Sequence, residues 1–258
     1  MQNIALPNKI SFKEGDQENS GQVIIEPCFP GYGITIGNSL RRVLLSSLEG
    51  AAVVGVKIKG VDHEFMSLPH VKEDILEILM NLKELRIKIF SDDDEIVKLS
   101  LSVAGKKAVK ASDIKADSNV EIVNKDLKIA TLTDMAGNID MEIFVKRGIG
   151  YETVEMREDK TTEIGYLEID SIFSPVLNIG LDIENVRVGK MTNWDKLVIN
   201  ILTDGTVSPF DAFKKANQIL IEQFSSLTEE NKEKEDKENE TVDEEVEDKK
   251  KKKTKKSE

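Results

Sequence analysis

The chain has few of the side chains that most often build reactive sites. It contains one cysteine, Cys28, and two histidines, His63 and His70, in 258 residues. A single thiol cannot form an intrachain disulfide, a redox pair or a zinc knuckle. Long apolar runs are also absent, and residues 1–10 lack the basic and then apolar pattern of a leader. These absences predict a soluble, unprocessed protein of the reducing cytoplasm, with no membrane partner.

Motifs for catalysis and cofactor binding are missing as well. The sequence has no phosphate loop, dinucleotide fingerprint or nucleophile elbow. The glycines of residues 31–37 leave a phosphate site as a minor alternative, while the two histidines lack the spacing of a zinc-binding helix. The acidic residues 92–95 have no partner acids at the spacing of a calcium loop, so a solvated turn is the default. We therefore expect no catalytic residue, metal or cofactor in this chain.

The charge is acidic overall, at a net −12. Residues 228–258 are almost entirely charged, with acids first and a lysine run last, and they hold too few apolar side chains to offset the entropy of ordering. We expect this tail to be disordered and to act as a solubilising segment, since its acids weaken the field of its lysines. The remaining body is acidic too. This opposes nonspecific nucleic-acid binding as the main task, although it leaves room for a local basic patch.

Hydropathy patterns predict an α+β fold. Residues 4–26 read as a hairpin, and the apolar run from residue 51 reads as a strand. A helix with a broad apolar face is predicted over about 71–85. From 86 to 188 the pattern alternates between strands and turns, which is typical of an antiparallel β-rich region. The apolar run from residue 196 adds a last strand, which ends at a turn formed by Asp204 and Gly205.

Residues 31–50 predict an amphipathic helix around which the fold is arranged. Thr35 or Asn38 is the expected N-cap, and Gly50 is the expected stop. At 100° per residue, one face carries an apolar stripe: Ile36, Leu40, Val43, Leu44 and Leu48. The far side carries Leu45 among two arginines, Arg41 and Arg42. A solvated surface helix is the ordinary interpretation, and a face that binds a partner is the alternative.

A second well-marked helix is predicted over residues 209–227. Ser208 is the expected N-cap, Pro209 suits the first helical position, and Asp211 completes a capping box. Four apolar residues follow a heptad-like spacing: Phe213, Leu220, Phe224 and Leu227. Packing on the protein's own sheet and association with a second copy both remain open.

Long stretches of the chain then carry a resemblance to a known family. They are, in order, GYGITIGNSLRRVLLSSLEGAAV, IKGVDHEFMSLPHVKEDILEILMNLKEL, YLEIDSIFSPV and VRVGKMTNWDKLVINILTDGTVSPFDAF. Together with IIEP before them, they resemble the amino-terminal domain of the alpha subunit of bacterial-type DNA-directed RNA polymerase over about residues 1–227. That family usually continues into a small helical DNA-binding domain. Only the charged tail follows here, so binding of promoters and activators is not carried over.

The resemblance implies a fold and a role. A dimerisation subdomain is expected from residues 1–52 and 178–227, with a β-rich subdomain inserted at 53–177. The implied function is a homodimeric, non-catalytic subunit of the nucleotidyltransferase complex, on which the β and β′ subunits assemble. Omega and sigma would join through the complex, and DNA would be contacted only indirectly. A stand-alone binding module on the same scaffold is the rival, and it would dimerise but ignore β and β′.

The resemblance also assigns contacts residue by residue. Arg42 and Leu45 match positions that contact β, and Arg41 and Lys83 are carried over to the same role. Residues 170–176 and 187–196 match regions associated with the large subunits. The implied dimer interface consists of Ile36, Leu40, Val43, Leu44, Phe213, Leu220, Phe224 and Leu227.

Overall fold

The computed structural model of the chain describes residues 4–15, 17–91, 95–116, 118–157 and 163–228. These residues form an α+β fold, as the sequence predicts, and they hold two large hydrophobic cores and one small cluster of Ala52, Val54 and Phe173. Two α-helices are bounded by Tyr32–Ser46 (α1) and Ile75–Lys83 (α2), and a further helix covers 209–228. The strands are β1 Lys9–Glu14, β2 Ser20–Cys28, β3 Glu49–Ile58, β4 Ile87–Ile89, β5 Val97–Ala104, β6 Ala108–Lys110, β7 Val120–Ile122, β8 Lys128–Thr131, β9 Asn138–Ile149, β10 Tyr151–Glu152, β11 Tyr166–Glu168, β12 Ser171–Ile172, β13 Val176–Val188 and β14 Met191–Thr203.

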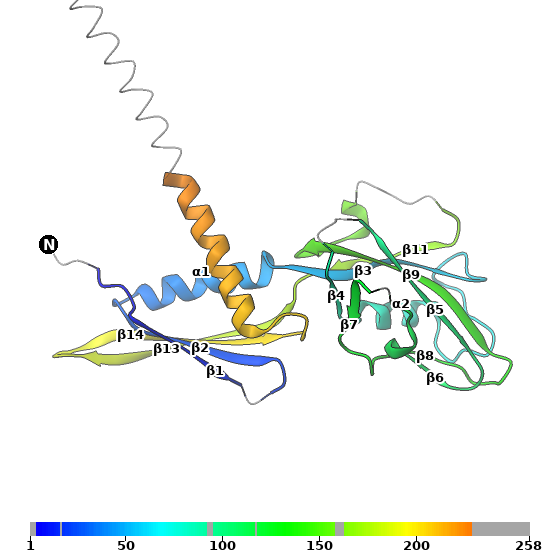
Figure 1. The fold of residues 1–258 in the computed structure, drawn as a ribbon, viewed down its shortest axis with the longest axis horizontal. Coiled ribbons are helices and arrows are strands. Elements are labelled where there is room, and N and C mark those ends of the chain that lie inside the picture. The colour runs from blue at the N-terminus through cyan, green and yellow to red at the C-terminus, as the bar shows by residue number, and fades with distance from the viewer. Residues whose placement is uncertain (1–3, 16, 92–94, 117, 158–162, 229–258) are drawn as a thin grey trace, which may run out of the picture.

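The first core joins the two ends of the chain. Strands β1, β2, β14 and β13 form an antiparallel sheet in that order, and α1 and the helix at 209–228 lie on one of its faces (Figure 1). The two inner strands pair in a register that sets Val23 opposite Ile199. These two side chains pack with Leu40 and Leu44 of α1 and with Phe213 of the last helix. The core therefore exists only when both ends of the chain have come together.

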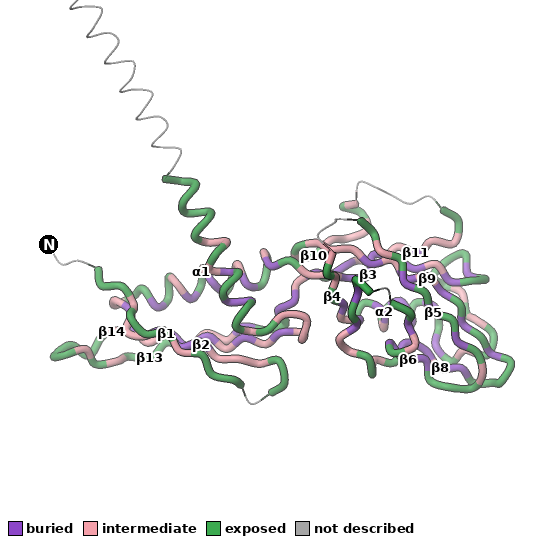
Figure 2. Tube along the Cα trace, in the orientation of Figure 1, coloured by how far each residue is buried: buried purple, intermediate pink, exposed green. Residues whose placement is uncertain are grey.

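The second core fills a curled sheet in the middle of the chain. Its strands run in the order β5, β9, β3, β4 and β7, and β11 pairs with β3. From Lys98 to Ala104, strand β5 alternates between exposed and buried residues, which is the period of two that a half-buried strand requires. Helix α2 contributes Ile75, Ile78, Leu79 and Leu82 to this core. Figure 2 shows buried segments gathered inside each of the two parts, which the start of β3 connects.

Helix α1 begins and ends differently from the prediction. It starts at Tyr32, after Gly31 in the left-handed region with φ at 85°, and no local side chain caps it. The predicted caps Thr35 and Asn38 lie inside the helix instead. At the other end, the helix is closed by the N–H of Ser47, which donates to Val43 O, and Gly50 belongs to β3. Gly50 faces the backbone of Phe173 so closely that no side chain would fit, and this close approach explains the glycine.

Helix α2 is shorter than the predicted 71–85. The residues before it are held along β8, because Val71 forms a β-bridge with Leu132 and the Lys72 N–H donates to Thr131 O. Long-range pairing has therefore replaced a local helical turn. The last helix starts as predicted, since the Asp211 N–H donates to the Ser208 hydroxyl at 3.1 Å. The turn at Asp204 and Gly205 is also confirmed, with Gly205 at φ 91°.

Glu73 is one of the few buried charged residues and fixes the start of α2. Its side chain is 2% exposed. Its carboxylate accepts hydrogen bonds from the Thr131 N–H at 2.6 Å and the Thr131 hydroxyl at 2.8 Å, and it lies 2.8 Å from Lys128 Nζ. Burial by itself raises the pKa of this carboxyl, but the hydrogen bonds from Lys128 and Thr131 outweigh burial, and the net pKa lies below 4.5. The folded state therefore favours ionised Glu73.

We predict that Glu73→Gln destabilises the protein at neutral pH by about 1–3 kcal/mol, because the amide cannot replace both the ion pair and the two accepted bonds. A carboxyl with a lowered pKa contributes stability above its unfolded pKa and loses it as the pH falls through the folded pKa. The difference between wild type and variant should therefore shrink in acid. Urea unfolding at neutral pH and at a pH below 4.5, the ordinary pKa of a glutamate side chain, measures this difference in unfolding free energy. Glu77→Gln, at an exposed site on α2, is the control, and a difference that does not depend on pH would contradict this account.

Candidate contact surfaces

The outward face of α1 carries the residues to which the sequence assigns a partner. Arg41 and Arg42 are exposed, and Leu45 is 37% exposed. Within the described part of the chain, no hydrogen bond or ion pair reaches either arginine side chain. Two guanidinium groups without partners beside an accessible leucine can donate bidentate hydrogen bonds and supply an apolar contact at once.

The opposite face of α1 is pressed against the sheet. Gly33, Gly37, Leu40 and Leu44 are buried. A Cβ at Gly37 would lie 3.0 Å from Leu197 Cδ1, which shows how closely the helix approaches β14. The predicted apolar stripe is confirmed, since Leu40, Leu44 and Leu48 are buried while Ile36 and Val43 are partly buried.

The first turn of α1 is capped from the far end of the sequence. Asp195 of β14 accepts hydrogen bonds from the Gly31 N–H at 2.9 Å and the Gly33 N–H at 3.1 Å, both through Oδ2. A phosphate at this glycine-rich turn would need the same N–H groups. They are already bonded to a carboxylate, so the geometry does not favour the phosphate alternative.

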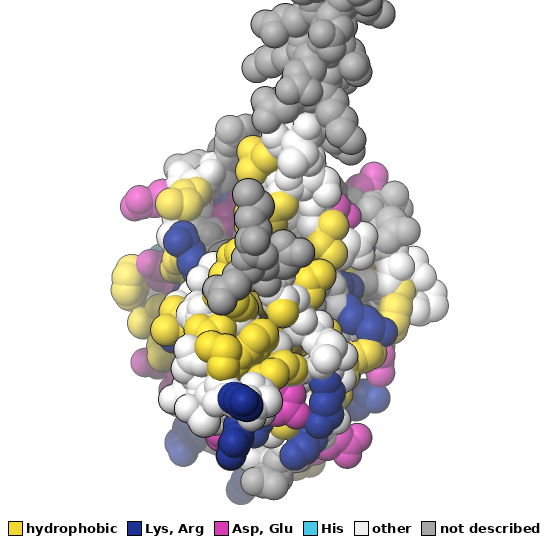
Figure 3. Space-filling model, turned by 90° about the vertical axis from the view of Figure 1, so that its left-hand side faces the viewer, with side chains coloured by type: hydrophobic (Ala, Val, Ile, Leu, Met, Phe, Trp, Pro, Cys, Tyr) yellow, Lys and Arg dark blue, Asp and Glu magenta, His cyan; other side chains and the backbone are white. Residues whose placement is uncertain are grey.

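An apolar surface covers the end of the molecule that holds α1 and the last helix. Along the last helix, Phe213 is buried in the protomer's own core and Leu220 packs against it, whereas Phe224 and Leu227 are 62% and 65% exposed. Figure 3 shows apolar side chains gathered on this end. Exposed apolar residues of the N-terminal segment, β1, α1 and the last helix include Ile4, Leu6, Ile10, Phe12, Ile34, Phe210, Ile221, Phe224 and Leu227. We call these nine residues the apolar end surface.

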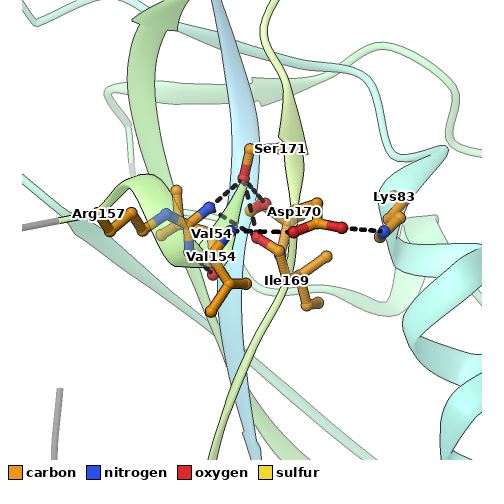
Figure 4. Close-up of polar contacts among 8 residues, drawn as sticks. Val54, Lys83, Val154, Arg157, Ile169, Asp170 and Ser171 are labelled. Carbon is orange, nitrogen blue, oxygen red and sulfur yellow. Dashed lines mark hydrogen bonds and ion pairs between the residues drawn. The ribbon is translucent and has the colours of Figure 1, made fainter. Parts of the chain in front are cut away.

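A cleft of about 930 Å³ lies in the middle part of the chain, beside α2. Its apolar lining includes Phe65, Leu76 and Met80, all of them exposed. Lys83 lies on the same cleft, and its Nζ is 3.5 Å from Asp170 Oδ2 (Figure 4). Lys83, a predicted contact residue, therefore lies next to Asp170, which is the first residue of the predicted contact segment 170–176.

Asp170 is held in its charged form. The Val154 N–H donates to Asp170 Oδ1 at 3.0 Å. This backbone hydrogen bond is the main reason that the pKa of Asp170 is lowered, and the charge of Lys83 adds to it against a smaller opposing effect of burial. Lys83 thus faces a carboxylate that stays ionised in mild acid.

Arg157 ties the strands behind this cleft together. Its guanidinium donates to Val54 O and Ile169 O at 2.6 Å and to the Ser171 hydroxyl at 2.7 Å (Figure 4). Its Nε makes no hydrogen bond within the described chain and lies 3.6 Å from Glu152 Oε2. Arg157 therefore links β3, which holds Val54, to the chain between β11 and β12 and to β12 itself.

The residues considered for metal binding are not brought together. His70 Nδ1 lies 3.9 Å from Asp134 Oδ2, while His63 lines the cleft. In the described ranges, no group of three or more histidine, cysteine, aspartate or glutamate side chains is placed to hold an ion. Residues 92–94 of the acidic turn lie outside the described residues, as does the charged tail from residue 229.

None of the helices in the described residues is long and apolar enough to cross a membrane.

Sequence reasoning missed several residues that matter here. Asp195 caps a helix that begins more than 160 residues earlier, and no local pattern signals such a contact. Arg157 is followed in the sequence by the polar residues 158–162, so local pattern predicts a surface position for it. Ile221 carries a signal in the sequence, since a large apolar residue off the predicted stripe of a helix indicates a second exposed face.

The fold and these surfaces define an α+β protein with two cores and several accessible contact faces. A family model described as "RNA polymerase Rpb3/RpoA insert domain" matches residues 56–174. The chain is 48% identical over 216 residues to the DNA-directed RNA polymerase subunit alpha of Lawsonia intracellularis, with 84% of this chain and 61% of that protein covered. The subunit of the same name from Desulforamulus reducens is 45% identical, with 86% and 70% covered, and that of a Roseiflexus species is 45% identical, with 90% and 70% covered.

The chain belongs to the DNA-directed RNA polymerase subunit alpha family. The sequence spans 61% to 70% of the length of these three relatives. These relatives are, by name, subunits of DNA-directed RNA polymerase.

We predict that Arg157→Lys destabilises the protein by about 2–4 kcal/mol, because a lysine cannot reproduce the planar fork that reaches two carbonyls and a hydroxyl. Urea unfolding measures this loss. Arg187→Lys is a matched control, since Arg187 donates from its Nε to Gly189 O at an exposed site. Equal loss in the two variants would show that the buried arrangement of Arg157 contributes nothing specific.

Proposed function

We propose that this chain is a homodimeric assembly subunit, which brings the β and β′ subunits of RNA polymerase together and does not hold the nucleotidyl-transfer site. The observation that carries the proposal is the outward face of α1. It presents Arg41, Arg42 and Leu45 to solvent without partners in the described chain, in a protein whose relatives are polymerase alpha subunits.

The contact with β is assigned to this face. Arg42 and Leu45 are three residues apart, so they are neighbours on the helix surface. An arginine fork beside an apolar anchor is the combination enriched at interface hot spots. Lys83 and residues 170–176, of which Asp170 lines the cleft beside α2, form a second contact, and residues 187–196 at the β13–β14 hairpin form a third. Each protomer would engage a different large subunit.

The dimer is assigned to the helical end. Phe224, Leu227 and the rest of the apolar end surface offer exposed area to a second copy, whereas Leu40, Leu44 and Phe213 support that surface from inside the protomer. Ile36, Val43 and Leu220 lie between these two groups, partly buried. A protein with this much exposed apolar area at one end gains free energy by covering it.

The boundaries proposed for the subdomains follow from the same division. Residues 1–52 and 178–227 form the dimerisation subdomain, and 53–177 form the insert. Support comes from the two large cores, since β1, β2, β13 and β14 build one sheet, and β3, β4, β5, β7, β9 and β11 build the other large sheet. The tail from 228 is assigned a solubilising role.

Our first prediction for this function concerns the dimer. Phe224→Asp should give monomers in light scattering, because dimerisation would bury an unpaired carboxylate at a cost of several kcal/mol. Since Phe224 is exposed in the protomer, the monomers should keep their fold and lose only the stability that dimerisation adds. Ser225→Asp places the same charge on the adjacent exposed residue and should leave the dimer intact. A stable Phe224→Asp dimer would remove this residue from the interface.

The second prediction concerns β. The double variant Arg42→Ala, Leu45→Ala should remain dimeric and recover less β by more than about tenfold in a co-expression pull-down, since two interface anchors are lost. The control removes an exposed basic and an exposed apolar residue from the insert, as Lys106→Ala, Met135→Ala. If wild type itself recovers no β, the stand-alone binding module becomes the better description.

A further inference from the structure

The start of α1 lacks the local cap that a helix normally has. Gly31 has no side chain to accept from the first-turn N–H groups, and the first turn contains no acidic residue. A helix left in this state exposes unsatisfied donors at its positive end. Asp195 supplies the missing acceptor through its two hydrogen bonds to Gly31 and Gly33.

The position of Asp195 is fixed by the sheet. It pairs with Cys28 of β2, and a register shift separates this pair from the next one, Leu197 with Ile25. The side chain is buried, with the whole residue 7% exposed. A Cβ at Gly33 would lie 2.9 Å from Asp195 Cβ. Helix and strand therefore meet at a distance that admits only glycine.

Aromatic rings close the same junction from the side. Phe29, which follows β2, packs edge-on against Trp194 of β14 with ring centroids 5.8 Å apart. It also contacts Tyr32, the first residue of α1, at 5.9 Å. The turn between β2 and α1 is thus held both by the carboxylate of Asp195 and by these rings. Together these contacts fix the direction of the first turn of α1.

We propose that Asp195 is a positioning residue for recognition of the large subunit, because it sets the start and direction of the helix that carries Arg42 and Leu45. This inference rests on the proposed function of α1. The two residues lie 11 and 14 positions beyond Gly31, so at about 1.5 Å per residue they are roughly 17–21 Å from the capped turn. A small change of helix direction at the cap is enlarged over that length.

The test compares Asp195→Ala, Asp195→Asn and the control Asp182→Ala in the full chain. Asp182 accepts from Asn200 Nδ2 at 3.0 Å on neighbouring β13, away from α1. Three properties are measured: amide hydrogen exchange, dimer content by light scattering, and recovery of co-expressed β.

We expect Asp195→Ala to lower amide protection in the first turn of α1 by roughly tenfold, the usual effect of losing a cap. Protection in β9 should stay at the wild-type level. Recovery of β by Asp195→Ala should fall while the chain remains dimeric. Asp195→Asn should recover an amount of β between those of wild type and Asp195→Ala, because its amide oxygen still accepts hydrogen bonds but carries no charge. Asp182→Ala should match wild type in all three measurements.

Wild-type recovery of β by a folded Asp195→Ala or Asp195→Asn variant with lost first-turn protection overturns the inference. If Asp195→Ala does not fold, Asp195→Asn decides by the same criterion. Gly33→Ala gives an independent check, because its methyl group would push the carboxylate away without altering charge, and we expect the same local loss. Failure of wild type to recover β would instead contradict the proposed function, while the exchange data would still report the role of Asp195 in α1.

Discussion

The pairing of β2 with β14 is the contact on which the rest of the structure depends. It joins residues about 175 positions apart, with Val23 opposite Ile199 and Ile25 opposite Leu197. These inward side chains form the floor on which α1 and the last helix pack. The same pairing delivers Asp195 to the start of α1. Without it, neither α1 nor the last helix would have this sheet to pack on.

Much of the fold could be predicted from the sequence, because many elements are marked locally. Ser208 and Asp211 indicate the start of a helix, and the alternating pattern of β5 indicates a half-buried strand. The faces of α1 follow from helical periodicity alone. What periodicity cannot supply is the partner across the fold. Thr35 and Asn38 were reasonable caps by local rules, yet the cap comes from Asp195, and residues 71–74 were drawn to β8 by pairing with residues 131–132.

The contact surfaces show the same limit. Phe213, Leu220, Phe224 and Leu227 form one series in the sequence, but the last helix rises away from the sheet as it passes α1 (Figure 1). The first member is therefore buried in the protomer and the last two are exposed. No pattern within the helix encodes that division, since it depends on the direction of the helix relative to the sheet. The resemblance to a family supplied the roles of these residues, and the structure supplies which of them have surface available to another molecule.

The order in which the chain is synthesised gives the long separation between β2 and β14 a further meaning. A ribosome makes α1 long before it makes residues 191–203, so during most of translation β2 has only β1 beside it and the first turn of α1 has no acceptor. The hydrophobic face of α1 likewise waits for β14. A nascent chain thus completes its second core, which lies within residues 53–169, before its first. The surface of α1 takes its final form only when nearly the whole folded region has been made, so an incomplete chain does not yet present this surface in its final position.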